Sequence, residues 1–273
     1  MMPYVKVSDI RMYYESTGEG DPLVLLHGLG SSHRDWSLQA PVFSKDYRVI
    51  IPDCRGHGDS DKPAGPYSIA LFARDVIALL DALGVEGSHL LGISMGGQVA
   101  LQIALDAPGR VSSLVLVNTF ARLIVRGRAG QLRLLQRRLL MPLLSMDKIG
   151  EIIAGTLFPL PEQRELFELV RTRWAQNDKP AYLASTRAAM AFDVARRLGG
   201  IRCPALIVAG ENDPTISMLH KEVLQRGILG SRLVVVKDSG HATPLDQPEE
   251  FNCIVLDFLR QQERFVKQKG VAV

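Results

Sequence analysis

The sequence predicts an α/β protein whose mostly parallel sheet carries helices on both faces. Short, continuously apolar runs such as residues 22–28 (PLVLLHG) and 47–53 (YRVIIPD) end at Gly or Asp and alternate with helical patterns over the first 118 residues. Strands covered on both faces lack the polar alternation of a half-exposed strand, so these runs indicate a parallel sheet between two helical layers. Apolar residues make up 47% of the 273 residues, which is enough for a substantial core.

The predicted elements follow in chain order. Residues 4–7 and 11–14 alternate apolar and polar side chains with period two, which predicts an antiparallel hairpin at one edge of the sheet. Residues 67–84 place apolar side chains at helical spacing and end at Gly84, where a C-cap glycine is expected. Buried strands are predicted at residues 22–28, 47–53, 88–94 and 112–118.

The strand–helix alternation stops after Asn118. Residues 120–197 contain helix-like segments punctuated by prolines and no clear strand. Alternation then resumes with apolar runs in 203–214 and 232–241, and the chain closes with a helix that begins near Pro248. The pattern therefore predicts one sheet domain that is interrupted by a helical insertion.

This insertion, residues 119–197, is expected to form a cap on a core built from residues 1–118 and 198–273. The net charge of +3 is unevenly distributed, because residues 119–199 hold 14 Lys and Arg against 7 Asp and Glu, giving +7. The remaining residues hold 18 against 22, giving −4. The asymmetry marks the insertion as a distinct unit, whereas a total of +3 does not indicate nucleic-acid binding.

Several classes of protein are excluded at this stage. The N-terminus lacks the basic start and apolar run of a signal peptide, and no apolar run approaches the roughly 18 residues of a membrane span. Cys54, Cys203 and Cys253 are odd in number and lack metal-ligand or disulfide spacing, so we expect buried, reduced thiols. These observations predict a cytoplasmic protein without metal or cofactor, and they are compatible with a homo-oligomer.

The motif GISMG, residues 92–96, lies between a predicted strand and a predicted helix. A serine hydroxyl becomes a nucleophile only when a base removes its proton and the turn presents it to substrate. A sharp strand-to-helix turn does this, and Gly92 and Gly96 remove side chains that would clash there. We therefore predict Ser94 as a catalytic nucleophile.

A nucleophilic serine requires a base and an acid that orients the base. His241 follows the last predicted strand, and Asp213 lies in the loop after the preceding strand, directly before a proline. Glu211 and Asp238 are the competing acids. The order Ser94, Asp213, His241 is that of the G-x-S-x-G hydrolases. The other histidines, expected in a strand, near the surface of a helix or in loops, are His89, His220, His27, His33 and His57.

The oxyanion of a tetrahedral intermediate needs two hydrogen-bond donors. We predict the backbone N–H of Met95, which follows the nucleophile, and that of Leu29, in the loop after an early strand. Gly28 allows this loop to approach the substrate, and His27 is expected to brace it. Substrate contacts are therefore predicted for Gly28, Leu29 and Met95, and in the cap for Trp174. Phe158, Phe167 and Met190 are expected to pack mainly within the cap.

The chain resembles the α/β-hydrolase superfamily in several motifs, which occur in the same order as in that family. The resemblance implies an eight-stranded, mostly parallel sheet with a helical cap inserted after the sixth strand. It also implies that Asp53, Arg55, His57 and Asp59 are structural. The motifs are LLHGLGSSHRDW, VIIPDCRGHGDSDKP, LLGISMGGQVAL, SLVLVN, PALIVAGENDP and DSGHATPLDQPEEFN.

Some branches of the superfamily fit poorly. Epoxide hydrolases and haloalkane dehalogenases carry an aspartate nucleophile where this chain has Ser94, and carbon–carbon bond hydrolases commonly carry tryptophan after the histidine, where it has Ala242. The chain most resembles carboxylesterases, 3-oxoadipate enol-lactonases and cofactor-free haloperoxidases (perhydrolases).

The resemblance implies a cofactor-free serine hydrolase that cleaves a small or medium carboxylic ester through an acyl-enzyme. The alternatives are an enol-lactonase, a perhydrolase, a carbon–carbon bond hydrolase and, in another class, a ligand-binding receptor on the same fold. Residues 122–144 are basic, which suits a solvated cap helix, an anionic substrate or a membrane surface. Gly127 and Gly130 are expected to weaken that stretch as a continuous helix.

Overall fold

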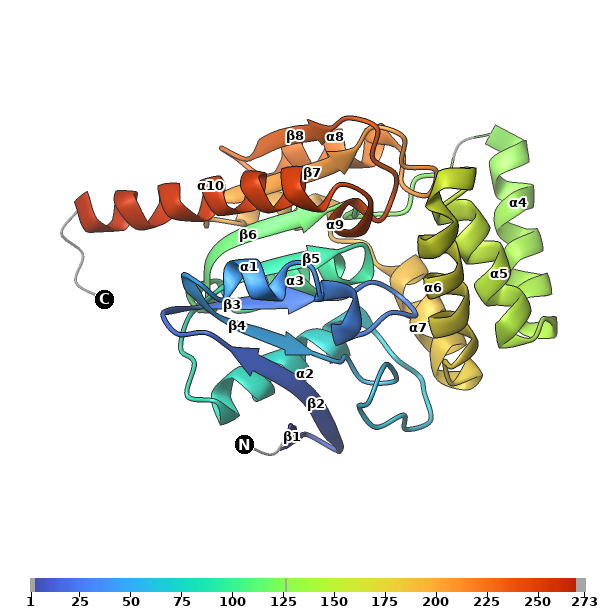
Figure 1. The fold of residues 1–273 in the computed structure, drawn as a ribbon, viewed down its shortest axis with the longest axis horizontal. Coiled ribbons are helices and arrows are strands. Elements are labelled where there is room, and N and C mark those ends of the chain that lie inside the picture. Colours follow the sequence, from blue (N-terminus) through green and yellow to red (C-terminus); the bar gives the residue numbers. More distant parts are fainter. Residues whose placement is uncertain (1–2, 126, 269–273) are drawn as a thin grey trace.

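The computed structural model describes residues 3–125 and 127–268, and its centre is an eight-stranded sheet (Figure 1). The strand order is β1-β2-β4-β3-β5-β6-β7-β8; β1 and β2 run antiparallel to their neighbours, and the strands from β4 to β8 are parallel. The predicted mostly parallel sheet and its edge hairpin are confirmed. The strands are β1 (Tyr4–Val7), β2 (Ile10–Thr17), β3 (Asp21–Leu26), β4 (Tyr47–Pro52), β5 (Ser88–Ile93), β6 (Val111–Val117), β7 (Ala205–Gly210) and β8 (Arg232–Val236).

The central strands are buried on both faces, which is why their sequences are continuously apolar. Along β3, Leu23 and Leu25 join one apolar core, whereas Val24 and Leu26 join the other. All four side chains are fully buried. Burial of each side chain contributes roughly 1.5–3 kcal/mol, so the two-sided core stabilises the sheet far more than a half-exposed one would.

Helices cover both faces of the sheet. α1 (Ala40–Phe43) and α10 (Pro248–Gln268) pack on the core of Leu23, and α2 (Ile69–Ala82), α3 (Met95–Asp106) and α8 (Met218–Gly227) pack on the core of Val24. The predicted helix in 67–84 is confirmed as α2. Ser68 caps its start by accepting a hydrogen bond from the Leu71 N–H at 3.1 Å, and Gly84 follows its end with φ of +66°.

In the described part of the chain, four α-helices lie between β6 and β7 and are called the cap helices below. They are α4 (Gly127–Leu140), α5 (Met146–Leu157), α6 (Arg164–Ala175) and α7 (Lys179–Ala191), and they stand beyond the carboxyl ends of the strands (Figure 1). The two ends of the insertion meet, because Arg122 and Asp193 form an isolated β-bridge and the Val194 N–H donates to the Ala121 carbonyl at 2.9 Å.

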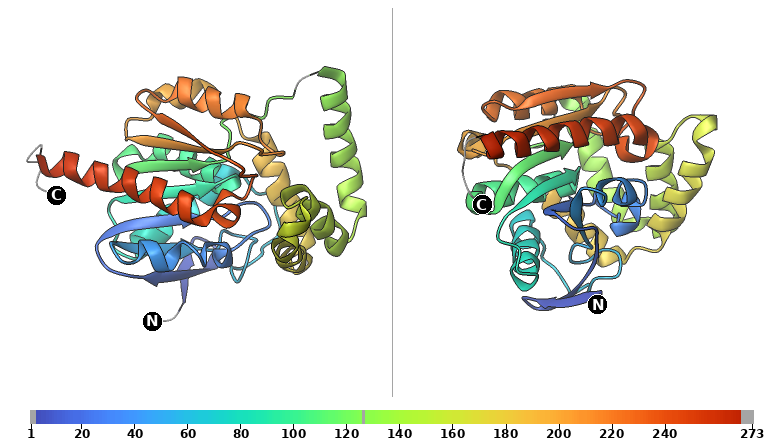
Figure 2. Two further views of the ribbon diagram at one scale, coloured as in Figure 1. Left: turned by 45° about the horizontal axis from the view of Figure 1, so that its top comes forward. Right: turned by 60° about the vertical axis from the view of Figure 1, so that its left-hand side comes forward.

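α4 is the outermost cap helix in the left view of Figure 2. The helix continues through Gly130, and Gly127, with φ of +66°, stands at its start. The expectation that these glycines weaken the stretch as a helix stays a prediction. Leu132 and Leu139 are more than half exposed on it. Arg126 of the predicted basic stretch lies outside the described residues.

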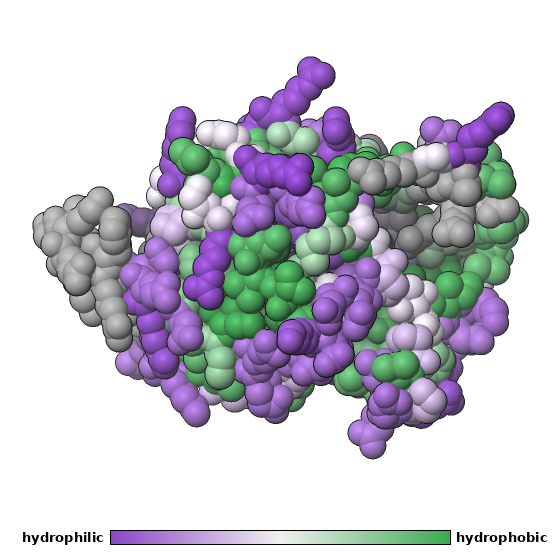
Figure 3. Space-filling model, turned by 90° about the horizontal axis from the view of Figure 1, so that it is seen from above, coloured by the Kyte–Doolittle hydropathy of each residue, from purple (hydrophilic) through white to green (hydrophobic). Residues whose placement is uncertain are grey.

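Strand β8 forms one edge of the sheet. Figure 3 shows apolar surface over the middle of the face seen from above, the side on which β8 lies in Figure 1. Val235, within β8, is 42% exposed, and Leu229, just before it, is 87% exposed. Arg232 and Lys237 flank the edge with charge, which opposes edge-to-edge pairing with other chains.

Two expectations about burial are wrong. Cys54 is buried, but Cys203 is partly exposed and Cys253 is exposed, because Cys253 lies off the face of α10 that carries Phe251 and Val255. His220 is buried, with a side-chain exposure near 6%, where a surface position was expected. None of the helices in the described part of the chain is long and apolar enough to span a membrane.

Candidate active site

Ser94 lies at the sharp turn between β5 and α3. Its backbone has φ of +53° and ψ of −114°, a conformation that costs a non-glycine residue roughly 1–3 kcal/mol. The surrounding chain holds this conformation, since the Ser94 N–H donates to the Val117 carbonyl at 2.9 Å and the Thr119 hydroxyl donates to the Ser94 carbonyl at 2.6 Å. The strained turn directs the serine side chain beyond the end of the sheet.

The glycines around Ser94 are required by close backbone contact. A Cβ on Gly96 would lie 2.5 Å from the carbonyl carbon of Leu26 and 2.7 Å from the His27 carbonyl oxygen. A Cβ on Gly92 would lie 2.6 Å from the Gly97 nitrogen. All three contacted atoms belong to the backbone and cannot turn aside, so any larger residue at either glycine would displace the turn.

His241 and Asp213 are paired. The Nδ1 atom of His241 lies 3.0 and 3.1 Å from the two carboxylate oxygens of Asp213, which also accepts the N–H groups of Thr215 and Ile216 at 2.8 and 3.0 Å. The competing acids are exposed: Glu211 and Asp238 lie on the surface, where a Glu211 oxygen accepts the Asp238 N–H at 3.3 Å. The geometry therefore joins Asp213, and neither competitor, to His241.

Burial alone would raise the pKa of Asp213, but the hydrogen bond and charge of His241, together with the charge of Lys221, lower the pKa from 3.8 to about 2. A carboxyl group whose pKa is lowered in the folded state stabilises the fold above its unfolded pKa, and this contribution disappears as the pH falls through the folded pKa. At about 1.4 kcal/mol per unit, the contribution of Asp213 is about 2 kcal/mol.

We expect the difference in unfolding free energy between wild type and Asp213→Asn to shrink as the pH falls from about 5 toward about 2, because the wild-type carboxylate becomes protonated. Urea unfolding at a series of pH values measures this difference, and subtraction removes the effect of all other carboxyl groups. A difference that stays constant over that range would contradict the assignment.

The loop after β3 runs beside Ser94. A Cβ on Gly28 would lie 3.7 Å from the Ser94 Cβ, and Leu29 lines the pocket described below. The N–H of Met95 belongs to the first residue of α3, but the Met95 side chain is only 2% exposed and packs in the core beneath the sheet. Met95 is not among the described lining residues of the pocket, so the predicted substrate contact of its side chain is wrong. Its backbone N–H remains a predicted oxyanion donor.

The cap helices contact the loop after β3 and hold it in place. Gly30, with φ of +70°, leaves room for the Trp174 indole, since a Cβ there would lie 2.6 Å from the indole nitrogen. The Asn177 side-chain amide donates to the Gly30 carbonyl at 2.8 Å, and Arg173 pairs with Asp35 at 2.6 Å. Helix α6 and the turn after it thereby fix the position of the loop that carries Leu29, a predicted oxyanion donor.

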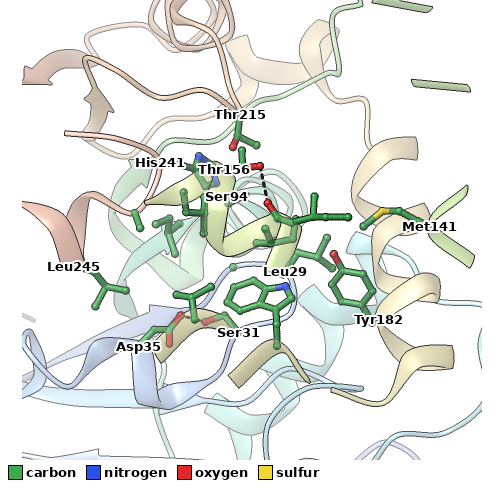
Figure 4. A pocket seen from close by; sticks show the side chains of 18 of the residues that line it. Leu29, Ser31, Asp35, Ser94, Met141, Thr156, Tyr182, Thr215, His241 and Leu245 are labelled. Carbon is green, nitrogen blue, oxygen red and sulfur yellow. Dashed lines mark hydrogen bonds between the residues drawn. The ribbon is translucent and has the colours of Figure 1, made fainter. Parts of the chain in front are cut away.

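Ser94 and His241 both face a pocket of about 480 Å³ between the sheet and the cap helices (Figure 4). The walls are mostly apolar. The described lining contains no lysine or arginine, and its one charged carboxylate is that of Asp35. The predicted contacts Gly28, Leu29 and Trp174 are among the lining residues, which also include Met141, Leu144, Ile152, Ile153, Thr156, Leu157, Val170, Tyr182, Thr215, Ala242 and Leu245.

Sequence reasoning missed Asn118, which connects the two loops that carry Asp213 and His241. Its side-chain amide donates to the His241 carbonyl and to the Thr243 hydroxyl, both at 2.8 Å, while its oxygen accepts the Gly210 N–H at 2.9 Å. The residue is fully buried and has φ of +42°. Its place directly after a buried strand was the only signal in the sequence.

Sequence reasoning also missed Lys221, on α8. Its ammonium lies 2.6 Å from a carboxylate oxygen of Asp213, and its side chain is 1% exposed. The signal available was a break in an apolar pattern, because Lys221 stands on the buried face of α8 three residues before Leu224 and seven before Ile228. Only the three-dimensional structure shows that this face of α8 contacts the loop that carries Asp213.

Asp53 and Arg55, two of the residues implied to be structural, connect buried loops, whereas the Asp59 side chain is exposed. Asp53 accepts the His33 N–H at 2.6 Å and the Asp59 N–H at 2.8 Å, and Arg55 donates to Asp75 at 2.7 Å. In the described part of the chain, donor atoms of His33, Asp53 and Asp59 lie within 4.8 Å of one another. The hydrogen bonds that Asp53 already accepts account for this cluster as a brace.

His27 braces the loop after β3 to the loop after β4. It is fully buried; its Nε2 accepts the Cys54 N–H at 3.0 Å, while its Nδ1 lies 2.8 Å from the Gly28 carbonyl. Burial lowers the pKa of His27, so the ring stays neutral and can keep one donor and one acceptor.

Two relatives resemble this chain over most of its length. A putative carbamate hydrolase RutD from Azorhizobium caulinodans is 31% identical, with 94% of this chain and 98% of the relative covered. A 2-hydroxy-6-oxo-6-phenylhexa-2,4-dienoate hydrolase from Comamonas testosteroni is 32% identical, with 94% and 93% covered.

Solved structures also resemble this chain over most of its length. The enol-lactonase from Burkholderia xenovorans LB400 superposes with a TM-score of 0.88 at 28% identity, covering 94% of this chain and all of the other. A thermophilic esterase from Thermogutta terrifontis superposes with a TM-score of 0.84 at 27% identity, with 95% and 98% covered. Residues 23–252 match the family described as the alpha/beta hydrolase family. The chain therefore belongs to the alpha/beta hydrolase family.

Proposed function

We propose that the protein is a serine hydrolase of neutral carboxylic esters that works without a cofactor. The observation that carries the proposal is the meeting of Ser94 with the hydrogen-bonded pair of His241 and Asp213 at one apolar pocket. An apolar pocket with a few convergent polar groups is the usual form of a small-molecule site. Relatives and structural neighbours include hydrolases of carbamates, enol-lactones and esters.

In the proposed mechanism, His241 removes the proton of the Ser94 hydroxyl, and the serine oxygen attacks the ester carbonyl. The N–H groups of Leu29 and Met95 stabilise the oxyanion, and His241 then protonates the leaving alcohol. Asp213 fixes Nδ1 of His241 as the protonated nitrogen, so Nε2 is the base. Water activated by His241 releases the acid from the acyl-enzyme.

The charge around the pocket favours a neutral substrate. Among the described lining residues Asp35 carries a negative charge, and Arg173 is paired with its carboxylate at 2.6 Å. A substrate carboxylate would meet no free lysine or arginine among the described lining residues. This argues against an anionic lactone as the preferred substrate.

We expect hydrolysis of p-nitrophenyl esters to become more efficient from acetate to longer acyl chains and then to fall once the chain exceeds the pocket. Each methylene buried in apolar walls contributes about 0.8 kcal/mol, or about fourfold in kcat/KM. Steady-state kinetics on the acetate-to-laurate series measures the trend. A flat series, with the protein folded, would contradict an apolar acyl site.

A second candidate is hydrolysis of neutral lactones, favoured by the same apolar pocket and by the similarity to an enol-lactonase structure. The two candidates share Ser94 and His241 and differ only in whether the leaving alcohol stays tethered. Competition between p-nitrophenyl butyrate and a neutral γ-lactone, with a carboxylated lactone as the matched control, compares them directly. Preference for the carboxylated lactone would overturn the argument from charge.

A further inference from the structure

Helix α8 carries a buried cation that the proposed mechanism does not use, and it lies against the loop of Asp213. The Lys221 ammonium lies 2.6 Å from Oδ2 of Asp213 and also donates to the Ile216 carbonyl. Both side chains of the Lys221–Asp213 pair are 1% exposed, so solvent does not screen their interaction. His241 contacts the same carboxylate oxygen at 3.1 Å.

Packing alone does not require a lysine at this position. Leu224 lies on the buried face of α8 and the buried Ile228 follows the helix, so an aliphatic residue at position 221 would complete this apolar packing without an ammonium group. Burying an ammonium group costs several kcal/mol before pairing, and a buried ion pair is seldom more stable than an apolar pair of the same volume. The contact with Asp213 therefore points to a role in the site.

The Asp213 carboxylate is held from three directions. Two backbone N–H groups and His241 contact Oδ1, and Lys221 and His241 contact Oδ2. A carboxylate whose charge is shared with a fixed cation attracts a protonated imidazole less strongly than an unshared one. Lys221 is therefore placed to influence both the orientation of the Asp213 carboxylate and the strength with which its negative charge attracts the protonated His241 ring.

We propose that Lys221 is a positioning residue of the Asp213–His241 pair, and that its ammonium partly neutralises Asp213 so that His241 is available as a base at lower pH. The proposal rests on the proposed function, in which Asp213 and His241 act together. Lys221 lines no part of the described pocket, so substrate binding does not depend on it directly.

The other titratable groups packed around this pair are accounted for by their own partners. The His220 Nε2 atom accepts the Ile124 N–H at 3.1 Å, its Nδ1 atom lies 3.0 Å from the Ser217 hydroxyl, and burial lowers the pKa of this histidine, which keeps it neutral. Asp246 accepts the Ser239 hydroxyl at 2.8 Å and the Gly240 N–H at 2.7 Å. Lys221 is therefore the cation that contacts Asp213 in the described part of the chain.

The test is the pH dependence of Lys221→Met, with Lys45→Met as the matched control, since Lys45 is an exposed lysine after α1. We expect the acid limb of the kcat/KM profile to move up by about one pH unit in Lys221→Met, with KM at the plateau unchanged, because a charge within a few ångströms shifts titrations by roughly that amount or more. Lys45→Met should leave the profile in place. Lys221→Gln replaces Lys221→Met if the apolar variant does not fold.

A purely structural role would lower activity by the same factor at every pH, and an unmoved acid limb would overturn the proposal. Titration of the His241 ring followed by NMR, in the Ser94→Ala background with and without Lys221→Met, gives a readout that needs no turnover. Its midpoint should rise in the double variant even if the protein hydrolyses no ester. An unchanged midpoint would reject the role of Lys221, whereas a shifted midpoint without ester turnover would reject only the proposed substrate.

Discussion

Ser94→Ala is expected to lower kcat for p-nitrophenyl butyrate by about 10⁴-fold or more while leaving the fold intact. The variant removes the atom that would form the acyl-enzyme, and only binding and oxyanion stabilisation would remain. Alanine is smaller than serine and keeps a Cβ, so the turn between β5 and α3 loses the hydroxyl and none of the hydrogen bonds made by its backbone.

The matched control is Ser31→Ala. Ser31 lines the same pocket, but its hydroxyl donates to Asp35, away from any histidine, so this variant should keep most of the wild-type kcat. Far-UV circular dichroism and labelling by a fluorophosphonate complete the measurement, because the label should attach to wild type and not to Ser94→Ala. Near-wild-type turnover in Ser94→Ala would remove the basis for the proposed nucleophile.

Asp213→Asn is expected to lower kcat by about 10³–10⁴-fold. An asparagine amide can present N–H where the carboxylate accepted the Nδ1 proton of His241, which favours the tautomer that cannot act as a base at Nε2. The same variant leaves Lys221 buried without its counter-charge, and breaking a buried pair in this way costs about 3–5 kcal/mol. We therefore expect a joint loss of activity and stability.

Asp238→Asn is the matched control, because Asp238 was one of the two competing acids and lies exposed with φ of +54°, a conformation that asparagine also adopts readily. It should retain wild-type kinetics and wild-type unfolding free energy. In the double variant Asp213→Asn/Lys221→Met, most of the stability should return, while kcat stays low. Equal kinetic losses in the Asp213 and Asp238 variants would refute the assignment of Asp213.

The serine turn could be predicted from the sequence because its requirements are local. Gly92 and Gly96 are needed by backbone contacts within a few residues of Ser94 and with the neighbouring strand, and that requirement appears directly as a short motif. The sheet was predictable for a similar reason, since burial on both faces leaves a continuously apolar strand. Cys253 could also have been placed correctly, because Phe251 and Val255 define the buried face of α10 and Cys253 lies off it.

The remaining contacts depend on residues that are far apart in the chain. Asn177 reaches Gly30 across 147 positions, and Asn118 reaches His241 across 123. Neither contact has a periodic signal, because a single polar side chain on a helix or after a strand does not indicate which loop it will meet. The inward direction of the Met95 side chain was equally hidden, since it depends on how α3 leaves the turn.

The contacts of Asn177 and Trp174 with Gly30 have a consequence for engineering and for divergence of the family. A cap taken from a relative would change the walls of the substrate pocket. It would also replace the contacts that hold the loop after β3, which carries Leu29. Chimeras that keep the core and replace residues 119–197 should therefore change turnover as well as selectivity. Transplanting Trp174 and Asn177 along with the new cap is the way to alter selectivity alone, and lineages that recombined caps would have faced the same constraint.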